Sequence, residues 1–181
     1  MLRKLAATLI LGVLLAGCET PVTGRYSILA DNNVAIRTLG VNGVAIGAFA
    51  PPATFDANCR ALGALQVSDN LTHTQYIQKA FEDELKVAGA FALSSPRVTL
   101  TGQVPRLEFS STRAVTGGSW TIDLVLISSN GNRMAVTEYY EFTSGFIATE
   151  ACRQTAEAFL RAVQNLVGKT VRSPQFASLV R

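Results

Sequence analysis

The segment Ser119–Thr143, SWTIDLVLISSNGNRMAVTEYYEFT, predicts a β-hairpin at the centre of the fold. Apolar and polar residues alternate on both sides of Asn130-Gly131, a dipeptide that is typical of tight hairpin turns. This alternation places the apolar side chains of each arm on one face of a strand. We expect the first strand to end at Ser128 and the second to begin at Arg133.

The register of this hairpin depends on which residues face each other across the two arms. A strict two-residue turn would pair Trp120 with Glu141, so that an apolar face meets a polar one. One additional, bulged residue matches the apolar faces better and gives the pairs Trp120–Phe142, Ile122–Tyr140 and Leu126–Val136. We therefore expect a bulged hairpin turn, in which Leu124 alone faces a charged residue, Glu138.

Two further strands are expected upstream of the hairpin. A long strand runs from Arg97 to about Ser110, and the parity of its apolar residues changes at Pro105-Arg106, where a bulge or bend is the natural cause. The apolar stretch Val34–Phe49 also favours a strand, because its small and apolar residues alternate.

Two helices with one apolar face each are also predicted. The first begins after Thr72, which opens a Thr-x-x-Gln capping box, and stops at Gly89. The second runs from about Glu150 to Val167, with Thr149 as its N-terminal cap and Gly168 as its stop.

The order of these elements predicts one α+β domain over residues 34–169. A β-α-β-β-β-α order favours a two-layer sandwich with both helices on one face of a mostly antiparallel sheet. The opposite face of the sheet then needs a partner, water or a membrane. Residues 170–181 are expected to form an irregular C-terminal tail.

The first 18 residues have the layout of an export signal. Arg3 and Lys4 precede an apolar run, Leu5–Leu15, which is shorter than the roughly 20 residues of a membrane-spanning helix. The following Leu15-Ala16-Gly17-Cys18 resembles a bacterial lipobox. The resemblance implies that residues 1–17 are a signal peptide, cut between Gly17 and Cys18, and that Cys18 carries acyl chains such as palmitate. The alternative is an ordinary signal peptide or an N-terminal anchor helix.

Residues 18–33 are interpreted as the lipidated N-terminus and a polar tether. Glu19 follows the lipobox cysteine, and in enteric-type sorting a residue other than Asp at this place resembles an outer-membrane address. The expected location is the outer membrane, lipid-anchored and facing the periplasm. Two or three acyl chains would make this attachment effectively permanent.

The charge balance excludes a typical nucleic-acid-binding protein. Loss of Arg3 and Lys4 with the signal leaves 14 of the 16 basic residues, against 13 acidic ones. Proteins that bind nucleic acid carry a clustered basic face, which this near-neutral composition does not predict.

Cys59 and Cys152 remain after the lipobox cysteine is set aside. An even pair in an exported protein favours a disulfide bond between them. The alternative is two unpaired buried thiols. A redox-active pair is disfavoured because the sequence has no Cys-x-x-Cys spacing.

The sequence contains no recognisable catalytic, metal or cofactor site. His73 is the only histidine, and we expect it to be solvated at the start of its helix. Glu82-Asp83-Glu84 is interpreted as a solvated helix face, since three consecutive helical residues point in different directions. Neither a Gly-x-Ser-x-Gly elbow nor a phosphate-binding glycine motif occurs. We expect no enzyme activity and no cofactor.

Four arginines near the predicted strands are the remaining candidates for a binding surface. They could gather along one edge of the sheet and meet phosphates or acidic partners, or lie scattered on the surface, which is the default expectation. These residues are Arg97, Arg106, Arg113 and Arg133.

A lipobox followed by a tether and this domain, over about residues 40–168, resembles the small periplasmic lipoproteins that accompany outer-membrane assembly machines. By layout it is similar to the LptE type, which plugs and helps assemble the lipopolysaccharide-transporting barrel. The resemblance implies a non-enzymatic binding or assembly factor whose partners are the membrane, through Cys18, and an envelope protein such as an outer-membrane barrel or a transporter. Cys18 is the one functional residue that is carried over.

Two other classes of function stay open from the sequence. One is an auxiliary lipoprotein of an ABC-type lipid-transport complex, the PqiC type, or of a secretion complex, the curli-pore type. The other is an enzyme whose site the sequence does not reveal. The order of secondary-structure elements does not choose among these classes.

Overall fold

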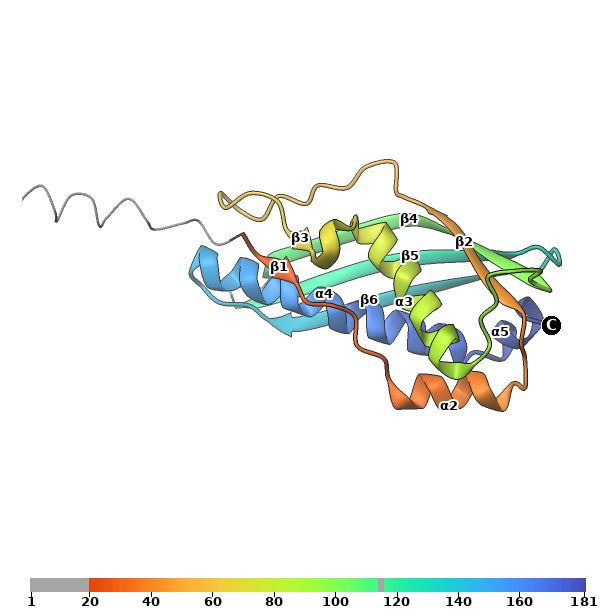
Figure 1. Cartoon of the computed structure of the whole chain (residues 1–181). Coiled ribbons are helices and arrows are strands. Elements are labelled where there is room, and N and C mark those ends of the chain that lie inside the picture. Colours follow the sequence, from red (N-terminus) through yellow and green to blue (C-terminus); the bar gives the residue numbers. More distant parts are fainter. Residues whose placement is uncertain (1–19, 114–115) are drawn as a thin grey trace, which may run out of the picture.

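The computed structural model describes residues 20–113 and 116–181. The expected signal peptide, its cleavage site and Glu19 lie outside these residues. Figure 1 shows the arrangement of the elements along the chain. They are β1 (Val22–Thr23), α2 (Ala30–Thr38), β2 (Val44–Ala50), β3 (Gln66–Val67), a 3-10 turn (Ser68–Asn70), α3 (His73–Ala88), β4 (Val98–Arg113), β5 (Gly117–Ser128), β6 (Arg133–Thr143), α4 (Ala148–Val171) and α5 (Pro174–Leu179).

The main sheet has four strands in the order β2-β4-β5-β6. β2 pairs with β4 in parallel, while β4–β5 and β5–β6 are antiparallel. The long helices α3 and α4 pack against this sheet (Figure 1). The molecule is therefore a mixed α+β sandwich with a mostly antiparallel sheet, as the sequence predicts. β1 and β3 form a separate two-stranded parallel pair.

The core lies between the sheet and the two long helices. Alternate residues of β5 face this layer and are buried, and Trp120 is 0% exposed. The Trp120 indole packs on Phe159 of α4 with ring centroids 4.6 Å apart, and its Nε1 donates a hydrogen bond to the Thr155 carbonyl at 2.8 Å. The tryptophan thus joins the sheet to α4 without leaving a buried N–H group unpaired.

The expected irregularity in β4 is confirmed. The register between β4 and β5 shifts between Gln103 and Arg106, on either side of Pro105. Val104 and Leu107 are both buried although their parities differ. The bulge therefore keeps one face of this long strand apolar past a residue that cannot donate to the ladder.

The expected register of the hairpin is wrong by two residues of β6. Trp120 pairs with Tyr140, Ile122 with Glu138, Leu124 with Val136 and Leu126 with Met134. The reason is turn geometry: Ser128 bonds to Asn132, so only residues 129–131 form the turn between them, and Gly131 has a φ of 90°. A shift of two residues keeps every side chain of β6 on its predicted face, so Glu138 stays on the core side but lies opposite Ile122 instead of Leu124.

Buried Glu138 is neutralised from α4. Its side chain is 2% exposed, Lys169 Nζ lies 2.5 Å from its Oε2, and Asn165 donates to its Oε1 at 3.1 Å. An unpaired carboxylate in this position would be costly, so α4 supplies both partners at spacing i, i+4.

The first long helix agrees with its predicted caps. Thr72 accepts from the Gln75 backbone N–H, the Gln75 side chain accepts from the Thr72 N–H, and Gly89 closes the helix at a φ of 74°. The predicted ends of α4 are wrong. The helix begins after Ile147 without a side-chain cap and continues through Gly168 to Val171. At Gly168 an added Cβ would lie 3.0 Å from Oδ1 of Asn32, so this glycine permits close packing of α2 rather than ending the helix.

The two predicted chain ends also require correction. Residues 20–33 do not form a free tether, because Thr23 is 0% exposed and donates to the Ala156 carbonyl at 2.9 Å. Residues 34–38 belong to α2, not to a strand. At the other end, the supposed irregular tail contains α5, whose Phe176 is 0% exposed. The packed domain therefore extends beyond 34–169 in both directions.

Candidate functional site

Cys59 and Cys152 are joined in a disulfide bond, the pairing that the sequence favours. Their Cα atoms are 5.8 Å apart, and both residues are 0% exposed. The bond links the turn of residues 59–63, which lies between β2 and β3, to the second turn of α4. Gly17 and Cys18, the predicted cleavage and lipidation residues, lie outside the described residues.

His73 is buried, which contradicts the solvated position expected from sequence. It is 8% exposed, and its ring centroid lies 4.8 Å from that of Phe55, 4.9 Å from Phe159 and 5.9 Å from Trp120. Burial lowers the pKa of His73 to about 4, because the charged imidazolium would lose its water. The neutral imidazole therefore packs among the aromatic side chains of the core at the first residue of α3.

A surface hollow lies next to this aromatic cluster. Its volume is about 420 Å³, and it is lined by residues of the 51–57 and 64–74 segments. His73 Nε2 is buried and has no hydrogen-bond partner among residues 20–113 and 116–181. The described residues also contain no group of three or more His, Cys, Asp or Glu that could hold a metal ion.

The acidic run on α3 divides between surface and core. Asp83 pairs with Lys79, and Glu82 with Lys86, so these two are on the surface as expected. Glu84 is 0% exposed, which the sequence interpretation missed.

The Glu84 carboxylate fastens the N-terminal segment to α3. Its Oε1 accepts hydrogen bonds from Tyr26 Oη at 2.8 Å, from the Leu29 N–H at 3.1 Å and from Asn32 Nδ2 at 3.1 Å. Burial and the neighbouring Glu84 carboxylate raise the pKa of Tyr26. These contacts give the buried carboxylate a structural role.

The four candidate arginines make separate local contacts. Arg97 donates to the Val180 carbonyl at 3.2 Å, Arg106 pairs with Asp123 at 3.4 Å, and Arg113 pairs with Glu141. Arg133 begins β6 at the opposite end of that strand from Glu141. They do not form one anion-binding cluster, which agrees with the default expectation of scattered surface arginines.

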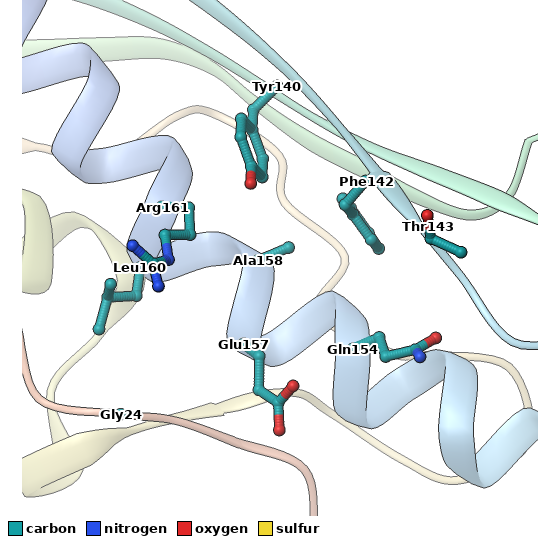
Figure 2. Close-up of a pocket in the computed structure, with 9 residues that line it drawn as sticks. All are labelled: Gly24, Tyr140, Phe142, Thr143, Gln154, Glu157, Ala158, Leu160 and Arg161. Atoms are coloured by element: carbon teal, nitrogen blue, oxygen red, sulfur yellow. The ribbon is translucent and has the colours of Figure 1, made fainter.

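A second hollow lies where α4 passes beneath the edge strand β6, and we call it the α4–β6 hollow. It has a volume of about 460 Å³. Figure 2 shows Tyr140 and Phe142 extending from β6 toward the turn of α4 that carries Ala158. The lining residues are Gly24, Tyr140, Phe142, Thr143, Gln154, Glu157, Ala158, Leu160 and Arg161.

Small residues and aromatic rings together create this hollow. Tyr140 and Phe142 are half-buried, and their ring centroids lie 6.5 Å apart. Opposite them, Ala158 presents only a methyl group. Exposed Glu157 and Arg161 project from α4 around this apolar floor (Figure 2). An apolar floor with a polar rim is the usual composition of a binding surface.

β6 borders the hollow and is a terminal strand of the sheet. The Ser128 N–H donates to the Asn132 carbonyl at 2.9 Å next to the turn. Bonded and non-bonded pairs alternate in an antiparallel ladder, so every second residue of β6 directs its N–H and C=O groups away from β5. Those residues are Arg133, Ala135, Thr137, Tyr139, Glu141 and Thr143, and among them the Thr137 carbonyl already accepts a hydrogen bond from Lys169 Nζ at 3.4 Å.

No family model matches this chain, and no curated protein matches it. In fold it is similar to a Xanthomonas campestris protein described by the family model DUF330, with a TM-score of 0.46 and 14% identity over 84% of this chain and 93% of that one. It is also similar to a Caulobacter crescentus protein whose description assigns it provisionally to the lipoproteins, with a TM-score of 0.32 and 13% identity over 77% of this chain and 94% of that one.

Within residues 20–113 and 116–181, no helix has both the length and the apolar character needed to cross a bilayer.

Proposed function

We propose that this chain is a lipid-anchored envelope protein that binds an extended segment of a partner protein along the free edge of β6, without catalysing a reaction. The lipobox-like Leu15-Ala16-Gly17-Cys18 supports the anchor, and Glu19 supports an outer-membrane location facing the periplasm. The observation that carries the binding role is the edge of β6 beside the α4–β6 hollow.

An edge strand with unused N–H and C=O groups can accept another strand. Such strand addition obtains affinity from backbone hydrogen bonds and specificity from pockets that receive alternate side chains. β6 spans Arg133–Thr143, long enough to offer several outward N–H groups. The α4–β6 hollow lies on the core side of this edge, where alternate side chains of an added strand would be directed.

The surroundings of β6 favour a segment of mixed polarity. Tyr140 and Phe142 offer apolar contact, while Glu157 and Arg161 offer charges of both signs at the rim. On the outer face of β6, Tyr139 is 47% exposed and the Arg113 guanidinium lies 5.6 Å from its ring. An assembly factor that grips a segment of a barrel or transporter subunit fits this combination, in the manner implied by the LptE-type resemblance.

A proline substitution separates strand addition from other ways of using this surface. Glu141→Pro removes one outward N–H group and leaves the bonds to β5 intact, whereas Glu141→Ala removes the same side chain and its pairing with Arg113 but keeps the N–H. A photoreactive amino acid at Tyr139 of the full chain, activated in the native envelope, reports the neighbour by mass.

We expect a protein adduct that survives Glu141→Ala and is largely lost in Glu141→Pro. An adduct equally strong in both variants would refute strand addition. Lipid adducts alone would instead support the auxiliary lipid-transport role, with an acyl chain in the same hollow. Circular dichroism of both variants checks that the fold is retained.

A further inference from the structure

Apolar side chains are exposed together at the end of the molecule where β6 runs into α4. Phe146 is 78% exposed and Ile147 is 68% exposed, and they are adjacent in the sequence. Leu62, which is 38% exposed, lies in the neighbouring turn of residues 59–63. We call these three residues the apolar tip. Exposed apolar side chains that gather in this way mark a surface that meets another molecule or a membrane.

The loop that carries the apolar tip is held in place by hydrogen bonds. Arg60 donates to the Phe146 carbonyl at 2.9 Å and to the Ser111 carbonyl at 2.7 Å, which ties the 59–63 turn to this loop. The Gly145 N–H donates to the Gln154 side chain at 2.5 Å. The Cys59–Cys152 disulfide lies directly behind these contacts. These hydrogen bonds and the disulfide therefore hold the loop in the conformation that exposes Phe146 and Ile147.

The N-terminal segment leads to the same end of the molecule. Thr23 contacts Ala156 of α4, and Ser27 contacts Gln164. An extended chain covers about 13 Å between these two contacts, and α4 covers about 12 Å, so the segment runs parallel to the helix. Extending this path backward places Thr20 beside the first turn of α4, next to the apolar tip. Figure 1 shows the first described residues, in red, at the end where α4 begins and β6 stops.

The predicted lipid attachment lies only two residues before Thr20. Two residues of chain reach at most about 7 Å, so acyl chains on Cys18 would enter the membrane close to the apolar tip. We infer that Phe146, Ile147 and Leu62 insert into the interfacial region of the bilayer beside the lipid anchor. This inference rests on the anchor proposed above and adds a second, oriented contact with the same lipid surface.

A second contact would fix how the domain stands on the membrane. An acyl anchor alone lets an attached domain rotate freely, whereas apolar side chains embedded at the headgroup level add a defined orientation. With the apolar tip in the bilayer, the strands of the sheet extend away from the membrane and the edge of β6 stays open to the periplasm. The packed residues 20–33 keep the domain close to the surface, in contrast to the tether expected from sequence.

An environment-sensitive fluorophore on a cysteine tests this insertion in the full, lipidated chain. Phe146→Cys provides the reactive thiol, because Cys18 would be acylated and Cys59 is bonded to Cys152. Leu93→Cys is the matched control: Leu93 is 87% exposed and lies before β4, at the opposite end of the sheet. The protein is reconstituted into phosphatidylethanolamine–phosphatidylglycerol vesicles, with and without a nitroxide-bearing lipid.

We expect the probe at 146 to shift to shorter emission wavelength and to be quenched by the nitroxide lipid, while the probe at 93 does neither. Equal, water-like signals at both positions on protein that floats with the vesicles would overturn the insertion and leave the anchor intact. Absence of an acyl mass on Cys18 of the wild-type protein would overturn the anchor and the insertion together. In cells, a photoreactive amino acid at Phe146 must crosslink to lipid, and an adduct with a protein would show that the apolar tip is a protein interface instead.

Discussion

The two ends of the sheet are closed in different ways. The end that carries the apolar tip, which we call the near end, is tied by the Cys59–Cys152 disulfide and by Arg60. The far end, around the 129–131 turn, is closed by side-chain amides that donate to the backbone carbonyls of the last residues. The near end leaves Phe146 and Ile147 exposed.

The two ends also differ in how far their apolar residues are buried. At the far end, α5 folds back on the sheet, and Phe176, Leu179 and Val180 are each 0% exposed. Leu93 is exposed in the loop before β4, but its chain neighbours, Ala92 and Ser94, are not large apolar residues. The far end thus satisfies its own apolar groups, whereas the near end is rigid and still presents apolar groups outward. The near end therefore differs from the far end in the way that the proposed membrane contact requires, and four experiments test this difference.

Loss of the disulfide should have the largest effect. Cys59 and Cys152 are 93 residues apart in sequence, and closing a loop of that size stabilises by about 4–5 kcal/mol in the chain-entropy model. We expect the double variant Cys59→Ala, Cys152→Ala to lose most of that free energy of unfolding, measured by urea titration of the oxidised wild type and the variant. A wild type whose unfolding midpoint is unchanged by reductant would contradict a stabilising role for the bond.

Acidification should weaken the protein through His73. The folded-state pKa of about 4 lies below the value of about 6.5 for an exposed imidazole. The stability from burying the neutral ring is therefore complete above pH 6.5 and is lost as the pH falls from 6.5 toward 4. This pKa difference corresponds to about 3 kcal/mol at the acid end of that window.

The control for this pH effect is a side chain that cannot titrate. We expect His73→Leu to flatten the dependence of the unfolding free energy on pH between 6.5 and 4, followed by urea titration at several pH values. Parallel curves for wild type and variant would show that His73 gains a proton without leaving the core.

At the far end, the side chain of Asn130 should contribute more to the stability of the fold than the side chain of Asn132. Asn130 Nδ2 donates at 2.9 Å to the carbonyls of both Ser178 and Arg181, whereas Asn132 Nδ2 donates to Ser178 alone. We expect Asn130→Ala to lower the free energy of unfolding by about 1–2 kcal/mol and to speed amide exchange in α5, with a smaller change in Asn132→Ala. Similar exchange rates in both variants would show that α5 is held by apolar packing instead.

Polar substitution in the apolar tip should have the smallest effect on stability. Phe146 and Ile147 are mostly exposed, so Phe146→Ser with Ile147→Ser should change the free energy of unfolding by no more than about 0.5 kcal/mol. Leu93→Ser is the comparison at the far end. A large loss on thermal unfolding would mean that the tip residues support the fold, and the contrast between the two ends would disappear.

Sequence reasoning succeeded where a feature depends on residues close together in the chain. The Thr72–Gln75 capping box, the shift in β4 at Pro105 and the apolar faces of β5 and β6 are all local patterns. The α+β class followed from their order. The disulfide was predictable because two cysteines remained to pair in a chain whose first residues predict export.

The α4–β6 hollow could not be predicted in the same way. It arises from Ala158 facing Tyr140 and Phe142, and the hairpin and helix patterns do not say which turn of α4 lies under which residue of β6. The apolar Phe146-Ile147 pair was visible in the sequence, but its exposure depends on the contacts of Arg60 with this loop.

By itself, the sequence determined the α+β class, which face of β5 and β6 is apolar, and the lipobox-like start, because each depends on side chains a few positions apart. The tertiary structure alone decided that Glu84 is buried with Tyr26, 58 residues away, that His73 lies among aromatic rings, and that residues 20–33 lie along α4. These outcomes depend on contacts between distant segments, whose free energy exceeds the local preference of a polar residue for water.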